Sequence, residues 1–174
     1  MENLLKYALI ALIAFGVVPE AGAQKRRQGK ADRETADWRY ELESQGVGAQ
    51  GTVQIKVWSY SKFPETAQEQ AKKNSVHGVC FRGYGGSGGV QGKEPLVTPA
   101  QQIEHKEFFD KFFKDGGDYL RFVHLTGDHM VGPGDLIKVG KKEYKVGVVV
   151  SVDYQALRKY LESQKVIQSL GGMF

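Results

Sequence analysis

Two runs of alternating apolar and polar residues flank a glycine-rich break and constrain the fold more than any other feature. Apolar side chains occupy every second position from Trp38 to Leu42 and again from Val53 to Val57. Successive side chains of a strand point to opposite faces of its sheet, so this pattern is typical of strands with one buried face. Because the break at 46–51 is rich in glycine, the sequence predicts a β-hairpin.

Helical patterns follow the hairpin. Pro64 and alanines spaced by four residues predict a helix over 64–77, and 79–81 then predict a short buried strand or a last helical turn. A second helix begins with the pair Thr98 and Pro99 and runs to about residue 114. Its four phenylalanines indicate a core element.

The carboxyl-terminal third returns to strands. A strand is predicted over 119–125, a hairpin pairs 136–139 with 143–152, and Asp153 begins a final helix. Strands and helices are mixed, with hairpins at both ends. We therefore expect one α+β domain over 37–174, with a mainly antiparallel sheet and about three helices, rather than a doubly wound parallel sheet.

The first residues have the three parts of a secretory signal peptide, which we place at 1–23. A charged start precedes the apolar run 8–18, and Ala21-Gly22-Ala23 resembles a cleavage site. The apolar run is shorter than the roughly 20 residues that a membrane-spanning helix needs. We expect an exported chain, periplasmic or extracellular, with no transmembrane segment after cleavage.

Residues 24–36 are polar and basic, which predicts a flexible leader. The formal net charge of the chain is +4, and part of the excess lies in this leader. Such a leader is typical of a solvated segment, so we expect no nucleic-acid partner. With a single cysteine, the chain can form no intramolecular disulfide, and its stability must come from packing.

Two groups of residues are candidates for catalysis. His124, Asp128 and His129 lie together around a glycine turn, and Cys80 could act as a thiol nucleophile beside a histidine. The glycine-rich segment 83–92 lacks the lysine and hydroxyl residue of a phosphate-binding loop, and no helix follows it directly. We therefore expect no cofactor. We also expect no metal site, because zinc needs three or four ligands in a defined geometry, whereas His124 is predicted in a strand and Asp128 and His129 in a loop.

Aromatic and glycine residues near the first hairpin are candidates for binding. These are Trp58, Tyr60, Tyr84, Gly85 and Gly86. Aromatic side chains beside glycine-rich loops are common where proteins recognise glycans or peptides. The same alternation, however, predicts that some of these rings belong to the core.

The span from Trp38 to Tyr84 resembles a module of bacterial outer-membrane lipoproteins and of the amino-terminal domain of flagellar and curli assembly factors. In that module a strand pair precedes a helix with alanine every four residues, here Ala67 and Ala71, and the chain closes with a strand and a helix. This chain departs from it by lacking a lipidation cysteine at the cleavage point. The resemblance implies a non-catalytic subunit that packs against other envelope proteins.

Three functions remain open from the sequence. The first is an exported, non-catalytic interaction protein whose partners are other envelope proteins or a second copy of itself, bound through a sheet edge. The second is a small secreted hydrolase that uses the His/Asp cluster or Cys80. The third is a module that binds glycans or peptides through its aromatic residues.

Overall fold

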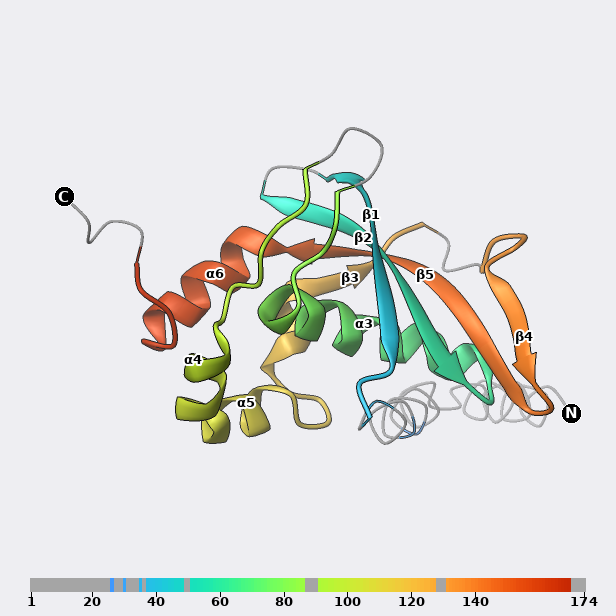
Figure 1. Ribbon diagram of the computed structural model, residues 1–174, viewed down its shortest axis with the longest axis horizontal. Coiled ribbons are helices and arrows are strands. Elements are labelled where there is room, and N and C mark those ends of the chain that lie inside the picture. Colours follow the sequence, from blue (N-terminus) through green and yellow to red (C-terminus); the bar gives the residue numbers. More distant parts are fainter. Residues whose placement is uncertain are drawn as a thin grey trace, which may run out of the picture.

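An antiparallel sheet and helices on one of its faces make up the structure, a computed structural model (Figure 1). It describes residues 26, 30, 35, 37–48, 51–86, 91–127 and 131–169. The elements in this part of the chain are β1 (Tyr40–Val47), β2 (Thr52–Ser61), α3 (Pro64–Phe81), α4 (Pro99–Glu104), α5 (Lys106–Phe112), the 3-10 helix η1 (Asp118–Phe122), β3 (Val123–Leu125), β4 (Leu136–Gly140), β5 (Glu143–Asp153) and α6 (Tyr154–Ser163). The predicted single α+β domain with a mainly antiparallel sheet is confirmed.

The strand order is β1-β2-β5-β3, and β4 also pairs with β5. Every pairing is antiparallel. The long strand β5 pairs with β4 along its first residues and with β3 near its end, so β3 and β4 share one edge of the sheet. Among the described strands, β1 forms the opposite edge.

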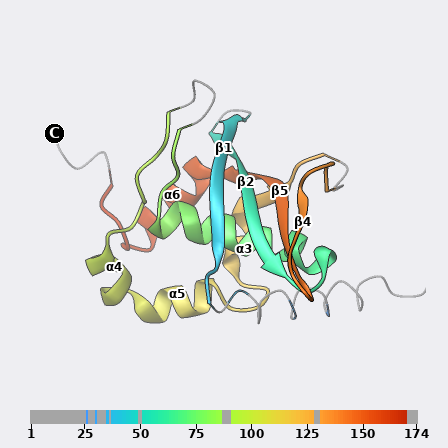
Figure 2. The same ribbon diagram turned by 45° about the vertical axis from the view of Figure 1, so that its right-hand side comes forward.

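Residue register decides which side chains lie beneath α3. Ser59 pairs with Tyr40 and with Val146, and Asn74 of α3 donates a hydrogen bond to the Ser59 hydroxyl at 3.0 Å. Ser59 and its cross-strand partners therefore lie on the inner face. Trp58, one residue earlier, lies on the outer face, which no helix of the described chain covers (Figure 2).

Helix α3 begins at the predicted Pro64 and runs beyond the predicted end at 77 to Phe81. Pro64 occupies its first turn, where the missing N–H costs no hydrogen bond. Gly83 follows the carboxyl end with φ +68°, a conformation that glycine adopts without strain. The alanines spaced by four residues, Ala67 and Ala71, are fully buried, so this small-residue face packs closely.

The predicted helix over 99–114 is interrupted. The backbone of His105 leaves the helical region (φ −102°, ψ 28°) and separates α4 from α5. Ile103 on α4 is 78% exposed, whereas Phe109 and Phe112 on α5 are buried. The two phenylalanines are three residues apart, so they share the face of α5 that packs into the core.

Residues 79–81 form the last turn of α3, which is one of the two alternatives that the sequence left open. One further boundary differs from the sequence-based expectation. The predicted strand over 119–125 begins only at Val123, because residues 118–122 form a 3-10 helix. With three residues per turn, this helix places Tyr119 and Phe122 on the same buried side, which an extended chain would not do.

Both predicted hairpins and the final helix are confirmed. The β1–β2 hairpin contains an irregularity between Ser44 and Gly46, and the β4–β5 hairpin turns at 141–142. Asp153 accepts a hydrogen bond from the Ala156 backbone N–H at 2.9 Å and so begins α6. Each helix in the described part of the chain is too short or too polar to cross a membrane. The predicted signal peptide 1–23 and most of the leader 24–36 lie outside the described residues.

Candidate functional site

The predicted His/Asp cluster is only partly described. His124 lies in β3 opposite Ser151 and is exposed, while Asp128 and His129 lie outside the described residues. Within the described ranges, no three histidine, cysteine or acidic side chains are arranged to hold a metal ion. The structure therefore adds no geometry to this candidate.

Cys80 lies inside the core rather than in a cleft. Its side chain is fully buried in α3, and burial raises the pKa of the thiol far above its usual value. A thiolate is the reactive form of cysteine, so this environment opposes nucleophilic chemistry.

We expect Cys80 to resist a thiol reagent such as DTNB in the native protein. The same reagent should label it completely once the chain is unfolded in guanidinium chloride. Absorbance of the released thionitrobenzoate measures both reactions. Fast stoichiometric labelling under native conditions would contradict the buried environment and restore the thiol hydrolase as a candidate.

His77, one turn before Cys80, is held in an aromatic cage. Its Nδ1 forms a 2.7 Å hydrogen bond with the Tyr40 hydroxyl, and the Trp38 ring stacks on the imidazole with centroids 3.5 Å apart. Burial, followed by the nearby cations Arg82 and Lys73, lowers the pKa of His77 to about 3. The imidazole is therefore neutral at physiological pH and ties α3 to the start of β1.

Trp58 is packed into the outer face of the sheet. Its indole N–H donates to a Glu43 carboxylate oxygen at 2.9 Å, and its ring lies over Gly147. The ammonium groups of Lys56 and Lys145 lie 4.9 and 5.1 Å from the ring centroid. Only 9% of this residue is exposed, so Trp58 offers no open ring face to a ligand.

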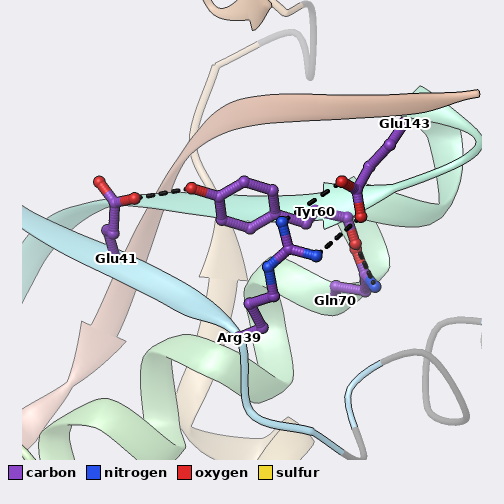
Figure 3. Close-up of polar contacts among 5 residues, drawn as sticks. All are labelled: Arg39, Glu41, Tyr60, Gln70 and Glu143. Atoms are coloured by element: carbon purple, nitrogen blue, oxygen red, sulfur yellow. Dashed lines mark hydrogen bonds and ion pairs between the residues drawn. The ribbon is translucent and has the colours of Figure 1, made fainter. Parts of the chain in front are cut away.

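Tyr60 belongs to a paired charge network on the same face (Figure 3). Its hydroxyl donates to Glu41 at 2.8 Å, and the Arg39 guanidinium lies 4.1 Å from its ring centroid while binding Glu143 at 2.8 Å. Hydrogen bonds from Lys145 and then from Tyr60 lower the pKa of Glu41. The half-buried Tyr60 ring thus has the Arg39 guanidinium close to its centroid and a hydroxyl group already bound to Glu41.

Tyr84, Gly85 and Gly86 lie elsewhere, beside the edge strand β1. The backbones of Tyr84 and Lys93 exchange two hydrogen bonds, at 2.9 and 3.0 Å, and so form a narrow pair of chain segments. A side chain at Gly92 would collide with the backbone of Tyr84 and Gly86, which explains the glycine there. The predicted binding residues thus divide between the outer face and this pair.

A groove of about 380 Å³ separates this pair of segments from β1. It is lined by Tyr40, Leu42, Arg82, Gly83, Tyr84, Gly85, Lys93 and Glu94. Tyr84 contributes a neutral hydroxyl group, because burial raises its pKa to about 12. The lining thus combines two cations, one carboxylate and the backbone of the edge strand.

The edge of β1 is capped at one end and open further along. Arg82 donates hydrogen bonds to the carbonyl oxygens of Trp38 and Tyr40, at 2.8 and 3.3 Å. The Tyr40 carbonyl therefore points away from β2. Because this direction alternates along a strand, the backbone groups of Leu42 and Ser44 also point toward the open edge.

Leu42 and Arg82 were not singled out from the sequence. Alternation marks Leu42 as an inner-face residue, but no local pattern shows that its strand ends the sheet. Arg82 is one arginine after a helix, and its role depends on a strand that begins 42 residues earlier. Only tertiary structure brings these residues together.

No protein-family model matches this chain, and no curated protein or solved structure matches it. Its fold and groove define an α+β module with an open sheet edge.

Proposed function

We propose that this chain is an exported, non-catalytic interaction module that binds an extended segment of a partner protein along the open edge of β1. The observation that carries the proposal is the groove beside β1, which Tyr40 and Leu42 of this edge strand line. A strand added to a sheet edge gains main-chain hydrogen bonds, while neighbouring pockets select its side chains.

The anchoring of β1 supports this use of its edge. Arg82 holds the first residues of the strand, and its guanidinium lies 4.2 Å from the Tyr40 ring centroid. On the other side, Tyr40 is bound to His77 of α3. A strand fixed in this way loses little conformational entropy when a partner pairs with it, which favours binding.

The mixed charges of the groove lining also favour binding of a peptide over binding of a small charged substrate. Lys93 lies 5.4 Å from the Tyr154 ring centroid, and Glu94 adds an opposite charge beside it. These groups can pair with polar side chains or with free backbone groups of an extended chain. The described groove contains no histidine, so it lacks the general base that peptide hydrolysis commonly uses.

The predicted signal peptide and the resemblance to envelope modules suggest where the partner is found. An exported chain meets other envelope proteins, and the resemblance implies a subunit that packs against them. We therefore place the partner among exported proteins and propose that this chain acts in an envelope assembly. Self-association through the same edge is the alternative within this class.

A proline at position 44 should weaken partner binding roughly tenfold, because it removes one backbone N–H from the open edge and one hydrogen bond is worth about this factor. Linear peptides selected from a displayed library on the full chain supply the probe. Fluorescence anisotropy then measures the affinity of each labelled peptide for the wild type and for Ser44→Pro.

Ser44→Ala is the matched control, because it keeps the N–H and removes a hydroxyl oxygen that lacks a hydrogen-bond partner. We expect it to bind like the wild type. Equal binding by all three chains would place the peptide elsewhere and reject the β1 edge. Failure to select any peptide would reject the interaction module itself.

A further inference from the structure

Strand β4 exposes an unusual amount of apolar surface. Leu136 is 47% exposed, Ile137 44% and Val139 45%, and the other two residues of the strand are exposed as well. An edge strand of this kind is a ready template for other chains unless charges protect it. Large apolar side chains that remain in water commonly mark a surface that something else covers.

A second segment adds apolar surface at the same end of the sheet. Ser61 lies opposite Tyr144, and Gly140 lies opposite Glu143, so the loop after β2 and the β4–β5 turn meet there (Figure 2). Phe63 in that loop is 47% exposed, although Lys30 covers one side of its ring at 3.1 Å from the centroid. We call Lys62, Phe63 and residues 136–142 the hairpin end.

Lysines surround the apolar side chains of the hairpin end. Lys62, Lys138, Lys141 and Lys142 are all exposed, and none forms an ion pair within the described chain. The neighbouring carboxylate of Glu143 is already paired with Arg39 at 2.8 Å. Glu65, in the first turn of α3, is the acidic residue nearest in sequence to Phe63. Positive charge therefore dominates this end.

We propose that the hairpin end binds the surface of an anionic lipid bilayer. Exposed apolar side chains enter the boundary between headgroups and acyl chains, while lysines with long aliphatic stems keep their ammonium groups among the lipid phosphates. Exposed Leu136, Ile137 and Val139 supply the apolar side chains that such an interface needs. The flanking lysines supply its positive charge. The proposal does not depend on peptide binding at β1, which lies on the other edge of the sheet.

A second copy of the chain is a poorer occupant. Two antiparallel β4 strands would bring Lys138 of one copy close to the lysines of the other. Like charges across a strand pair are destabilising, and edge lysines are a common protection against such pairing. A bilayer rich in anionic lipid supplies the opposite charge over the whole hairpin end.

A fluorophore on the hairpin tests the proposal locally, whatever the amino-terminal segment does. The full chain carries Val139→Cys labelled with NBD, and a second chain carries the label at Lys159→Cys on α6. Buried Cys80 stays unlabelled in both. Vesicles of phosphatidylcholine are compared with vesicles in which phosphatidylglycerol replaces part of that lipid.

We expect the label at position 139 to brighten and shift to the blue with anionic vesicles, and to respond little to neutral ones. Adding Lys141→Gln and Lys142→Gln should raise the lipid concentration at half-response about thirtyfold. Each lysine near an anionic surface strengthens membrane binding by roughly a factor of five, and two are removed. Lys111→Gln with Lys114→Gln on the Val139→Cys chain makes the same charge change near the end of α5 and should leave the response unchanged.

Three results would overturn the proposal. One is an unchanged signal at position 139 with anionic vesicles, and another is an equal change at position 159. The third is a signal at position 139 that rises with protein concentration in the absence of lipid, since it would assign the hairpin end to a second copy.

Discussion

Replacing Gly147 by valine is expected to lower the free energy of unfolding by about 3 kcal/mol, at the upper end of overpacking effects. Gly147 lies in the middle of β5, where valine has a far better intrinsic preference for a strand. A Cβ atom there would lie 2.9 and 3.0 Å from two carbons of the Trp58 ring, and 2.9 Å from Lys56 Cε. We expect the steric cost of this collision to exceed the gain from the higher strand propensity of valine.

The Trp58 ring has little freedom to move away. Its N–H is bound to Glu43 and it is 9% exposed, so a new methyl group must push the whole indole out of its place. Urea unfolding followed by circular dichroism measures the loss. Ser151→Val, on the same face of the same strand, is the matched control and should change the free energy of unfolding by less than about 0.5 kcal/mol.

A double variant separates the collision from other effects. In a Trp58→Ala background the ring is gone, and Gly147→Val should then be neutral or stabilising. If Gly147→Val lowers the free energy of unfolding equally with and without the Trp58 ring, the contact with Trp58 is not the reason for glycine at this position. The result also bears on function, because a tryptophan needed to fill the outer face is not available for a ligand.

The strands were predictable because their pattern is local. Alternation along 38–42 and 53–57 reports which side chains are buried, and one buried face is enough to fix the register of a hairpin. Helix α6 is likewise visible from its capping Asp153 and its spaced leucines. These signals depend on residues a few positions apart, so one sequence contains them.

What the sequence could not provide depends on distant contacts. The break at His105 lies between the exposed Ile103 of α4 and the buried Phe109 and Phe112 of α5. Periodicity within 99–114 is compatible with one straight helix, so no local pattern reports this break. Likewise, the 3-10 helix at 118–122 is favoured by the burial of Tyr119 and Phe122, which a strand pattern also fits.

The candidate site shows the same limit. Tyr84 and Gly85 are binding candidates because an aromatic residue stands beside a glycine-rich loop, and both line the groove beside β1. Trp58 and Tyr60 were chosen by the same reasoning, yet they lie on the outer face among paired charges. Aromatic content alone does not distinguish a ring that binds from a ring that fills space, because the difference is made by neighbours across the sheet.

Acid should destabilise this protein through His77, by about 3 kcal/mol between pH 6.5 and pH 4. The pKa of this buried imidazole is about 3 in the folded chain, against 6.5 for an ordinary histidine. A depressed pKa means that the unfolded chain binds the proton more readily. The contribution is therefore fully present above pH 6.5, and it is lost as the pH falls toward 3.

Burial is the main cause of this shift, and the cations Arg82 and Lys73 add to it. A charged imidazole would also have to remain within a cage formed by Trp38 and Tyr40. Chemical denaturation at several pH values measures the slope of stability against pH. Carboxylates titrate in the lower part of this range, so the wild-type slope alone does not isolate the histidine.

His77→Asn isolates it, since an amide can keep a hydrogen bond with the Tyr40 hydroxyl but does not titrate. Its average slope between pH 6.5 and pH 4 should be shallower than that of the wild type by about 1.2 kcal/mol per pH unit. If the variant is too unstable to measure, NMR of the wild-type imidazole should still show a neutral ring at pH 5. Equal slopes, or a ring protonated near pH 6, would mean that His77 is hydrated and that the cage does not hold the start of β1.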